Sequence, residues 1–393
     1  MKLFKLLLSV LILSNFSSCK NEEKSSEDTA QTTTTNEQTI PQETLDLVDN
    51  TSYTTELVVD GIDIPWGIDF LPDESMLVTE KSGTLYHIVN GKKTAIKNVP
   101  AVYNRGQGGL LDIKVHPDFK NNNFIFITYA SEEGEGKGGN TALIRAELKN
   151  NALENIKTLY KATPNTTRGQ HFGSRIVIDD QGFIFFTIGE RGNRDENPQD
   201  ITRDGGKLYR LHIDGSVPKD NPFVGKENAK EAIWSYGHRN PQGMEINPET
   251  NTIWLHEHGP KGGDEINIPK KGLNYGWPSI TYGKNYSGTT ITKDTSKPGM
   301  EQPVFYWVPS IAPSGMSFVT SDKYPNLKGN LLSGSLKFQY LEHNILDGEN
   351  VTKRERLLKD IGRVRSVEEG PDGFIYIGVE SKGILKLVTK QQK

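Results

Sequence analysis

The sequence predicts an all-β protein, a six-bladed β-propeller with four-stranded antiparallel blades. From Thr51 onward, short segments of alternating hydrophobicity are closed by Gly, Asn and Asp turns, as in residues 183–188 and 206–211. Almost no helical periodicity in this part of the chain is longer than two turns. One unit of strand, turn and strand also recurs six times along the chain.

The repeated unit is an apolar strand that ends at a Pro-Asp, Asp-Gln or Pro-Glu turn before the next strand begins. The six units start near Trp66, Leu111, Ser174, Gly243, Gly315 and Val364. Their turns lie at residues 72–73, 117–118, 180–182, 248–249 and 371–373, and at the degenerate 321–322 in the fifth unit. Because one blade cannot bury both faces of its sheet, six copies predict a closed ring. A pair of β-sandwiches is the alternative, but it does not readily explain six copies of one turn.

Composition excludes one class of partner. The 393 residues carry a formal net charge of -4 and are 34% hydrophobic, enough for a sizeable core and without the basic field that nucleic acid binding needs. Small molecules are therefore the expected partners.

The N-terminus predicts export. Residues 1–18 have a charged start and an apolar run too short to span a membrane, which is typical of a secretion signal. The single cysteine, Cys19, follows the small residues that close this run, an arrangement that resembles a lipoprotein signal with Cys19 acylated. An incidental cysteine in an ordinary cleaved signal is the alternative. The expected location is thus outside the cytoplasm, periplasm-facing or on the cell surface, with membrane contact only through this lipid.

The rest of the chain divides in two. Residues 19–50 are rich in Thr, Glu, Gln, Ser and Asn and predict a flexible polar tether, because they cannot bury enough surface to offset their ordering entropy. Residues 51–390 form the predicted propeller, the catalytic domain. With no second cysteine an intrachain disulfide is excluded, so packing and metal must stabilise the exported fold.

Propellers usually bind ligands where several blades converge at the mouth of the channel, so segments that interrupt the repeat are the candidate site. Five such segments join glycines to charged or hydrogen-bonding side chains: residues 106–111, 170–175, 237–243, 258–265 and 362–365.

Together with Trp66-Gly67, residues 274–278, residues 309–315 and Ser335-Leu336-Lys337, these segments follow an ordered set. This set resembles the soluble glucose and aldose sugar dehydrogenases that use pyrroloquinoline quinone (PQQ), from about Pro65 to Val388, and is most similar to the aldose branch. The resemblance implies oxidation of aldose sugars at the anomeric carbon to lactones, with hydride transfer to PQQ and electrons passing to an external acceptor.

His171 is the candidate catalytic base. Sugar oxidation needs a group that takes the hydroxyl proton while hydride leaves the carbon, and an imidazole titrates near neutral pH. A loop histidine judged alone is more often a hydrogen-bonded structural residue, and the family resemblance reverses this interpretation in favour of the base. His116, in a strand and turn context, is interpreted as structural.

The resemblance also implies which residues bind the cofactor. PQQ carries three carboxylates and a reactive quinone, so its site needs several cations. Lys337, Arg363 and Arg365 would hold the carboxylates, and Arg's planar fork suits that role. Arg239, counted with His171 among the catalytic residues, and Asn240 would contact the quinone side, and Gln107 and Gln242 would line the pocket. The alternative for Arg363 and Arg365 is an exposed edge strand with alternating charges; at i and i+2 both point to one face, where they can share an anion.

Calcium is the second expected cofactor. No loop of the EF-hand type is present in the sequence, so any Ca²⁺ would be bound piecemeal. The resemblance implies a catalytic Ca²⁺ held by the main-chain carbonyls of Gly259 and Pro260, and a second, stabilising Ca²⁺ held by the Glu265 carboxylate and the Tyr275 carbonyl.

Two other functions remain open at this point. A calcium-dependent lactonase would require Asp, Asn and Glu side chains around one channel metal, and it leaves the cationic trio without a purpose. A non-catalytic binding propeller has no need of His171, Arg239 and Lys337 together. The glucose branch has an aspartate where this chain has Gln170, so the sugar itself is not specified.

Overall fold

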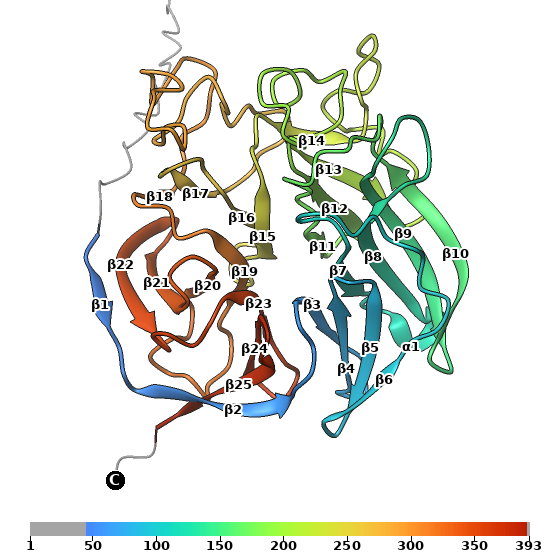
Figure 1. The fold of residues 1–393 in the computed structure, drawn as a ribbon, viewed down its shortest axis with the longest axis vertical. Helices are drawn as coiled ribbons and strands as arrows, with labels where there is room; N and C mark the ends of the chain where they lie inside the picture. The colour runs from blue at the N-terminus through green and yellow to red at the C-terminus, as the bar shows by residue number, and fades with distance from the viewer. Residues whose placement is uncertain (1–44, 391–393) are drawn as a thin grey trace, which may run out of the picture. The chain divides into compact units, whose positions relative to one another are not determined.

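The computed structural model describes residues 45–390, which form six antiparallel sheets and one short helix, α1 (Phe119–Asn122). The first strand of each sheet, β3, β7, β11, β15, β19 or β23, lies against a common centre, and the sheets radiate from it (Figure 1). The predicted six-bladed propeller is therefore confirmed. The predicted signal, Cys19 and most of the predicted tether lie outside the described residues.

The first three blades follow one another along the chain. Blade 1 contains β3 (Pro65–Phe70), β4 (Met76–Glu80), β5 (Thr84–Val89) and β6 (Lys92–Ala95). Blade 2 contains β7 (Leu110–Val115), β8 (Phe124–Ser131), β9 (Asn140–Lys149) and β10 (Ala152–Lys161). Blade 3 contains β11 (Ile176–Ile178), β12 (Phe183–Ile188), β13 (Lys207–His212) and β14 (Ile233–Tyr236).

The last three blades complete the ring. Blade 4 contains β15 (Pro241–Ile246), β16 (Ile253–Glu257), β17 (Asp264–Asn267) and β18 (Phe305–Trp307). Blade 5 contains β19 (Pro313–Phe318), β20 (Leu331–Ser335), β21 (Leu341–Asp347) and β22 (Asn350–Leu357). Blade 6 contains β23 (Val364–Glu369), β24 (Ile375–Val379), β25 (Gly383–Thr389) and, from the other end of the chain, β2 (Tyr53–Val59). Each repeat found in the sequence thus starts at or next to the innermost strand of a blade.

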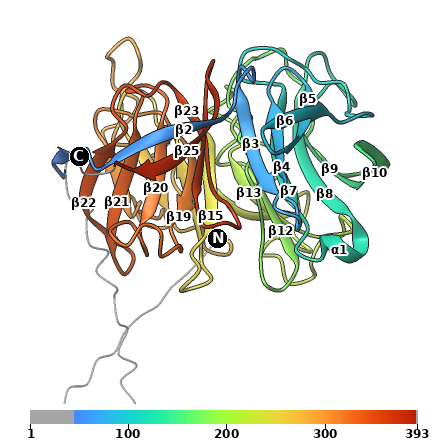
Figure 2. The ribbon, with the colours of Figure 1, turned by 90° about the horizontal axis from the view of Figure 1, so that it is seen from below.

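Strand β2 closes the ring. It pairs antiparallel with β25, with Tyr53 opposite Thr389 and Leu57 opposite Leu385, so blade 6 is built from both ends of the described chain (Figure 2). Strand β2 is anchored at its two ends, since Tyr53 and Val59 are buried while Leu57 between them is exposed.

Strand β1 (Leu47–Asp49) corrects one boundary, because it lies inside the range predicted to be tether. It pairs in parallel with β22, and Leu45 and Leu47 pack against the apolar cluster shared by blades 4 and 5. These few apolar side chains bury enough surface to hold the segment on the blade, which the polar composition of residues 19–50 as a whole concealed.

The core lies between the blades. Separate apolar clusters fill each of the six contacts between neighbouring blades, for example Leu77 of blade 1 with Ile125 of blade 2. Each blade therefore buries its faces only against its neighbours, as the repeat argument requires. No helix within residues 45–390 is long and apolar enough to cross a membrane.

Candidate active site

The predicted site residues gather at one end of the channel. The turns found in the sequence join the first and second strands of each blade and define the opposite end. Gln107, His171, Arg239 and Arg363 immediately precede innermost strands. Gly259 and Lys337 lie in loops between the second and third strands of blades 4 and 5, which turn back at that same end.

His171 lies in a loop whose conformation is unusual for its residue types. Its φ is 57°, and Gly173 and Ser174 that follow also have positive φ values of 63° and 91°. Non-glycine residues in this region carry roughly 1 kcal/mol of strain or more and cluster at functional sites. The backbone NH of His171 donates to Gln107 Oε1 at 2.8 Å. Gly189 completes the support, because a Cβ there would lie 2.4 Å from the His171 carbonyl oxygen.

The imidazole of His171 is paired with Glu190. Nδ1 contacts Glu190 Oε1, and Glu190 is only 2% exposed. A carboxylate can only accept a hydrogen bond, so this contact places the proton on Nδ1 and leaves the Nε2 lone pair available. Burial and then the charge of Arg239 lower the pKa of His171, while Glu190 acts in the opposite direction. The ring is thus neutral at pH 7, the form that can accept a proton.

Arg239 and Asn240 lie beside this pair, and each has one hydrogen-bond donor without a partner in the described chain. Arg239 Nη1 donates to the His258 carbonyl at 3.0 Å and the guanidinium lies over the Trp277 ring, but its buried Nε has no partner within residues 45–390. Asn240 is fully buried, and its Nδ2 is likewise without a partner in the described chain. Gln242 Nε2 donates to the Gly173 carbonyl at 3.1 Å, next to His171. Two orphaned buried donors at one place are typical of a site that holds an acceptor-rich ligand.

Arg363, which precedes β23, and Arg365, which lies at a bulge in β23, both pair with one carboxylate, that of Glu380. Nε of Arg363 contacts Glu380 Oε2 at 2.5 Å, and Nη2 of Arg365 contacts Oε1 at 2.5 Å. Although burial acts in the opposite direction, the two guanidiniums hold the pKa of Glu380 below its usual value. Arg363 Nη1 also donates to the carbonyl of Leu336 at 3.0 Å, which brings the exposed Lys337 to the same place.

His258 lies near three of the predicted site residues, Arg239, Arg365 and His171. Burial and then Arg239 lower its pKa well below the ordinary value, and Arg365 and His171 act in the same direction. The groups predicted for the base, the quinone side and the carboxylates therefore lie near one half-buried ring. Nε2 of His258 donates to the Pro313 carbonyl at 2.9 Å, which fixes this ring between blades 4 and 5.

The Gly259-Pro260 segment is shaped by Asp264. Oδ1 of Asp264 accepts from the Gly259 amide at 2.8 Å, and Oδ2 accepts from the Ala312 amide at 2.8 Å. A Cβ at Gly259 would lie 2.0 Å from the Gly263 carbonyl oxygen, so only glycine fits this turn. The Gly259 carbonyl accepts no hydrogen bond within the described chain, and the Pro260 carbonyl accepts one from Ser310 Oγ at 3.3 Å. Carbonyl oxygens of this kind suit Ca²⁺.

Glu265 and Tyr275 lie behind the site, on either side of Glu257. Glu265 is directly opposite Glu257 in the pairing of β16 and β17, and burial and this second carboxylate raise the pKa of Glu265 to about 8. Glu257 also accepts from His238 Nδ1 at 2.8 Å, and the His238 ring stacks on Tyr275. Groups of three or more His, Cys, Asp or Glu side chains with metal-binding geometry do not occur in the part that the structure describes. Any metal here would need main-chain oxygens.

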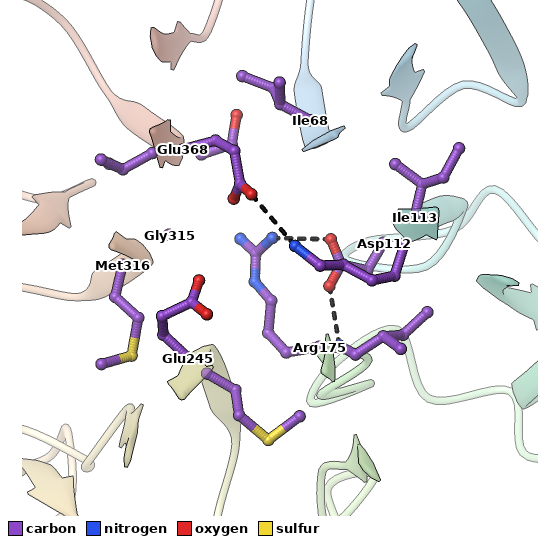
Figure 3. A pocket seen from close by; sticks show the side chains of 13 residues that line it. Ile68, Asp112, Ile113, Arg175, Glu245, Gly315, Met316 and Glu368 are labelled. Atoms are coloured by element: carbon purple, nitrogen blue, oxygen red, sulfur yellow. Dashed lines mark hydrogen bonds and ion pairs between the residues drawn. The ribbon is translucent and has the colours of Figure 1, made fainter. Parts of the chain in front are cut away.

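The channel below the site is filled by buried charges (Figure 3). Arg175, which immediately precedes β11, contacts Asp112 Oδ1 at 3.1 Å, and Lys114 of β7 contacts Glu368 Oε1 of β23 at 3.1 Å. The cavity between them measures about 20 Å³, room for about one water molecule. Arg175 also donates to the carbonyls of Gln242 at 2.6 Å and Arg365 at 3.0 Å, so this layer supports the site from beneath.

The sequence reasoning missed Glu190, Glu380 and the role of Asp264. Glu190 and Glu380 lie directly after the second strands of blades 3 and 6, the position that Lys337 and His258 occupy in blades 5 and 4. That shared place in the repeat was the signal that could have found them. His116, interpreted as structural, accepts a hydrogen bond from the Asp118 amide at 2.9 Å in a turn at the other end of the propeller.

Comparison with known proteins shows a matching family and several similar proteins. Residues 62–387 match the family model described as glucose/sorbosone dehydrogenase. The chain is 44% identical over 343 residues to the aldose sugar dehydrogenase YliI of Escherichia coli, covering 85% of this chain and 92% of that protein. The apo-form crystal structure of the soluble aldose sugar dehydrogenase from Escherichia coli has a TM-score of 0.83 at 42% identity, covering 86% and 100% of the two chains. A PQQ-bound aldose sugar dehydrogenase from Streptomyces coelicolor has a TM-score of 0.71 at 25% identity, covering 87% and 100%.

Proposed function

Because the chain belongs to the glucose/sorbosone dehydrogenase family and is an enzyme of this kind, we propose that it oxidises aldose sugars at the anomeric carbon to lactones with PQQ as the resident cofactor. The observation that carries the proposal is the neutral His171, held by Glu190, beside a cationic site with orphaned buried donors. The relative from Streptomyces coelicolor is an aldose sugar dehydrogenase in a PQQ-bound form.

His171 is proposed to be the general base. Nε2 accepts the anomeric hydroxyl proton, and Glu190 stabilises the imidazolium that forms. Burial and then Arg239 lower the pKa of His171 in the resting protein and so keep the base unprotonated until substrate arrives. When bound, PQQ supplies a two-electron acceptor for the hydride that leaves the anomeric carbon. The proton and the hydride together account for the two hydrogens lost when an aldose becomes a lactone.

The residues present fit a tricarboxylate quinone. Arg363, Arg365 and Lys337 are proposed to bind carboxylates, with Glu380 holding the two guanidiniums in a common orientation. Arg239 Nε and Asn240 Nδ2, the two orphaned donors, are proposed to face the quinone oxygens. Gln107 and Gln242 position the His171 loop and line the pocket around it.

Calcium is proposed at two places. The carbonyls of Gly259 and Pro260, in the turn that Asp264 holds, would bind the Ca²⁺ next to the cofactor. Glu265, opposite Glu257, and the carbonyl of Tyr275 would bind the stabilising Ca²⁺, which would offset the repulsion of the facing carboxylates. Chelator-treated protein is therefore expected to lose PQQ affinity and thermal stability, and both should return with Ca²⁺. Undiminished PQQ binding and full activity without any divalent ion would remove the metal from the proposal.

Reconstitution tests the function as a whole. Purified apoprotein is mixed with PQQ and Ca²⁺, and reduction of a redox dye is followed with a panel of aldoses as substrates. Dye reduction that needs PQQ and a free anomeric hydroxyl supports the proposal, and methyl glycosides should be inactive. Lactone hydrolysis without dye reduction would instead favour a hydrolase, and sugar binding without either reaction would favour a binding protein.

Export and anchoring through Cys19 are part of the same proposal, because an extracytoplasmic enzyme can pass electrons to an external acceptor. Cys19→Ser is expected to move the protein from the membrane fraction to the soluble fraction, since the thiol is the only one available for acylation. The specific activity per mole should stay unchanged. Membrane association equal to that of the wild type would contradict the anchor without touching the catalytic proposal.

A further inference from the structure

A second cavity lies outside the channel, between blades 2 and 3. It measures about 560 Å³, within the usual range for small-molecule sites. Its walls come from the segment that leads to His171 and from the loop after β12 that carries Glu190. Asn, Thr and charged side chains provide most of its lining.

The lining carries more positive than negative charge. Four cations, Arg168, Arg191, Arg203 and Lys230, line it together with one carboxylate, Asp204. Arg203 is paired with the exposed Glu196 at 2.7 Å, and Lys230 with Asp204 at 3.3 Å. Two of the four cations therefore have no anionic partner among residues 45–390.

Asp204 cannot serve the two remaining cations, because its oxygens are already in use. Oδ1 accepts from the hydroxyls of Tyr160 at 2.6 Å and Tyr209 at 3.0 Å. Oδ2 accepts from the Thr163 amide at 2.9 Å and faces Lys230. The carboxylate is only 3% exposed, so it is a fixed part of the wall.

Arg191 is the unusual member of the group. Its side chain is almost fully buried, and its guanidinium stacks on Phe172 at 3.4 Å and donates only to carbonyls, those of Gly139, Arg168 and Gln170. Nε is buried without a partner in the described chain. Because its Nη groups are satisfied by carbonyls, Arg191 adds a positive charge to the cavity wall, and a buried charge without a counter-ion favours an anion nearby.

Arg168 is the complementary, accessible member. It is exposed, and its side chain makes no hydrogen bond or ion pair within the described part of the chain. A guanidinium is planar and always charged, and it binds carboxylate and phosphate through paired hydrogen bonds. One buried and one free guanidinium on the same cavity make an oxyanion the fitting ligand.

We propose that this cavity binds a small molecule bearing a carboxylate or phosphate group, with the oxyanion against the arginines and the rest of the molecule against the Asn and Thr side chains. The site is separate from the proposed sugar oxidation and does not depend on it. Its occupant would contact the segments that hold the base, because the Arg191 amide donates to the His171 carbonyl at 3.3 Å and Asn197 Nδ2 donates to the Glu190 carbonyl at 3.0 Å.

Calorimetric titration of the full protein tests the proposal with three probes: inorganic phosphate, methyl glucuronide and methyl glucoside. The glycosides have no free anomeric hydroxyl, so neither is oxidised during the titration. We expect a Kd of about 1 mM or tighter for at least one of the oxyanions, and none for the neutral glucoside. Tighter binding of the glucuronide than of phosphate identifies an acidic sugar as the ligand, and the reverse order identifies a phosphate.

The variant Arg168→Gln/Arg203→Gln is expected to weaken oxyanion binding by about tenfold or more. Arg194→Gln is the matched control, because Arg194 lies on the same loop, contacts Asn285 and does not line the cavity. Each titration is repeated with PQQ present, which fills the other cationic site. Three results would overturn the proposal: no oxyanion binding by the wild type, equal binding by the double variant, or binding that disappears when PQQ is added. The last result would place the anion in the cofactor site.

Discussion

At the scale of single residues, the site depends on which proton His171 carries. Glu190 fixes Nδ1 as the donor, and the unusual backbone of residues 171–174 fixes where the ring points. Glu190 is thus a positioning residue that acts through His171. Its second oxygen, Oε2, is buried and has no partner within residues 45–390, so the only side-chain hydrogen bond of Glu190 in this range is the one to His171.

The pH dependence of the reaction follows from this pair. Because burial and Arg239 lower the pKa of His171 below 6.5, kcat/KM should rise with pH through a value below 6.5 and be level at neutral pH. Glu190→Gln removes a group that raises this pKa, so the acidic limb should move to lower pH while kcat falls by roughly 10²- to 10⁴-fold. Steady-state kinetics across pH measures both effects. A reduced kcat with an unmoved limb would show that Glu190 is only structural.

At the scale of elements, bulges and loops aim the site. The ladder between first and second strands is irregular at the start of β3, β7, β15, β19 and β23. The residues displaced from the ladder include Gln242 and Arg365, both predicted site residues. A bulge turns a side chain out of strand alternation, which is how an inner strand can present a functional group at the channel mouth.

A second prediction at this scale concerns strand β2, which joins the two ends of the described chain by pairing with β25. Tyr53→Ala should lower the free energy of unfolding by about 3 kcal/mol or more, because this buried ring packs against Tyr324 in the cluster of blades 5 and 6. Leu57→Ala, on the same strand but 61% exposed, should change it by less than about 0.5 kcal/mol. Urea denaturation of the two variants provides the comparison. Equal midpoints would mean that β2 does not close the ring.

The repeat made the fold predictable from sequence, because six turns recur at equivalent places and each blade needs its neighbours. The family motifs predicted that His171, Arg239 and Arg365 belong to one site. The place of Glu190 and Glu380 after the second strands of their blades could have marked them as site residues, but only the closed ring shows which cations and rings they pair with. The short strand β1 was also missed, since its two apolar residues, Leu47 and Val48, carry no periodicity within a polar segment.

At the scale of the whole molecule, Arg175 joins the ring below the site. From the edge of blade 3 it donates to the Trp66 carbonyl at 3.2 Å, the Asp112 carboxylate at 3.1 Å, and the carbonyls of Gln242 and Arg365. Five of the six blades therefore meet at one side chain, whose contact with Asp112 is drawn in Figure 3. The channel layer is thus a structural core made of ion pairs, and it fixes the backbone of two site residues.

Arg175→Met is expected to destabilise the protein by about 3 to 5 kcal/mol, because it leaves the buried Asp112 without its partner. Lys386→Met removes a surface ion pair with Glu56 and should cost about 1 kcal/mol or less. Thermal and urea unfolding measure both. A variant at Arg175 that unfolds with the same midpoint as the Lys386 control would show that the channel layer does not hold the blades together.

The central claim is that base chemistry and cofactor binding are carried by different residues of one site. It is tested most directly by measuring turnover of an aldose as a function of PQQ concentration, at saturating Ca²⁺, for His171→Ala and Lys337→Ala. His171→Ala should keep near-normal PQQ affinity and lose roughly 10²- to 10⁴-fold in kcat. Lys337→Ala should need more PQQ and recover activity when PQQ is in excess. Near-normal turnover by His171→Ala when PQQ and Ca²⁺ are saturating would contradict the account.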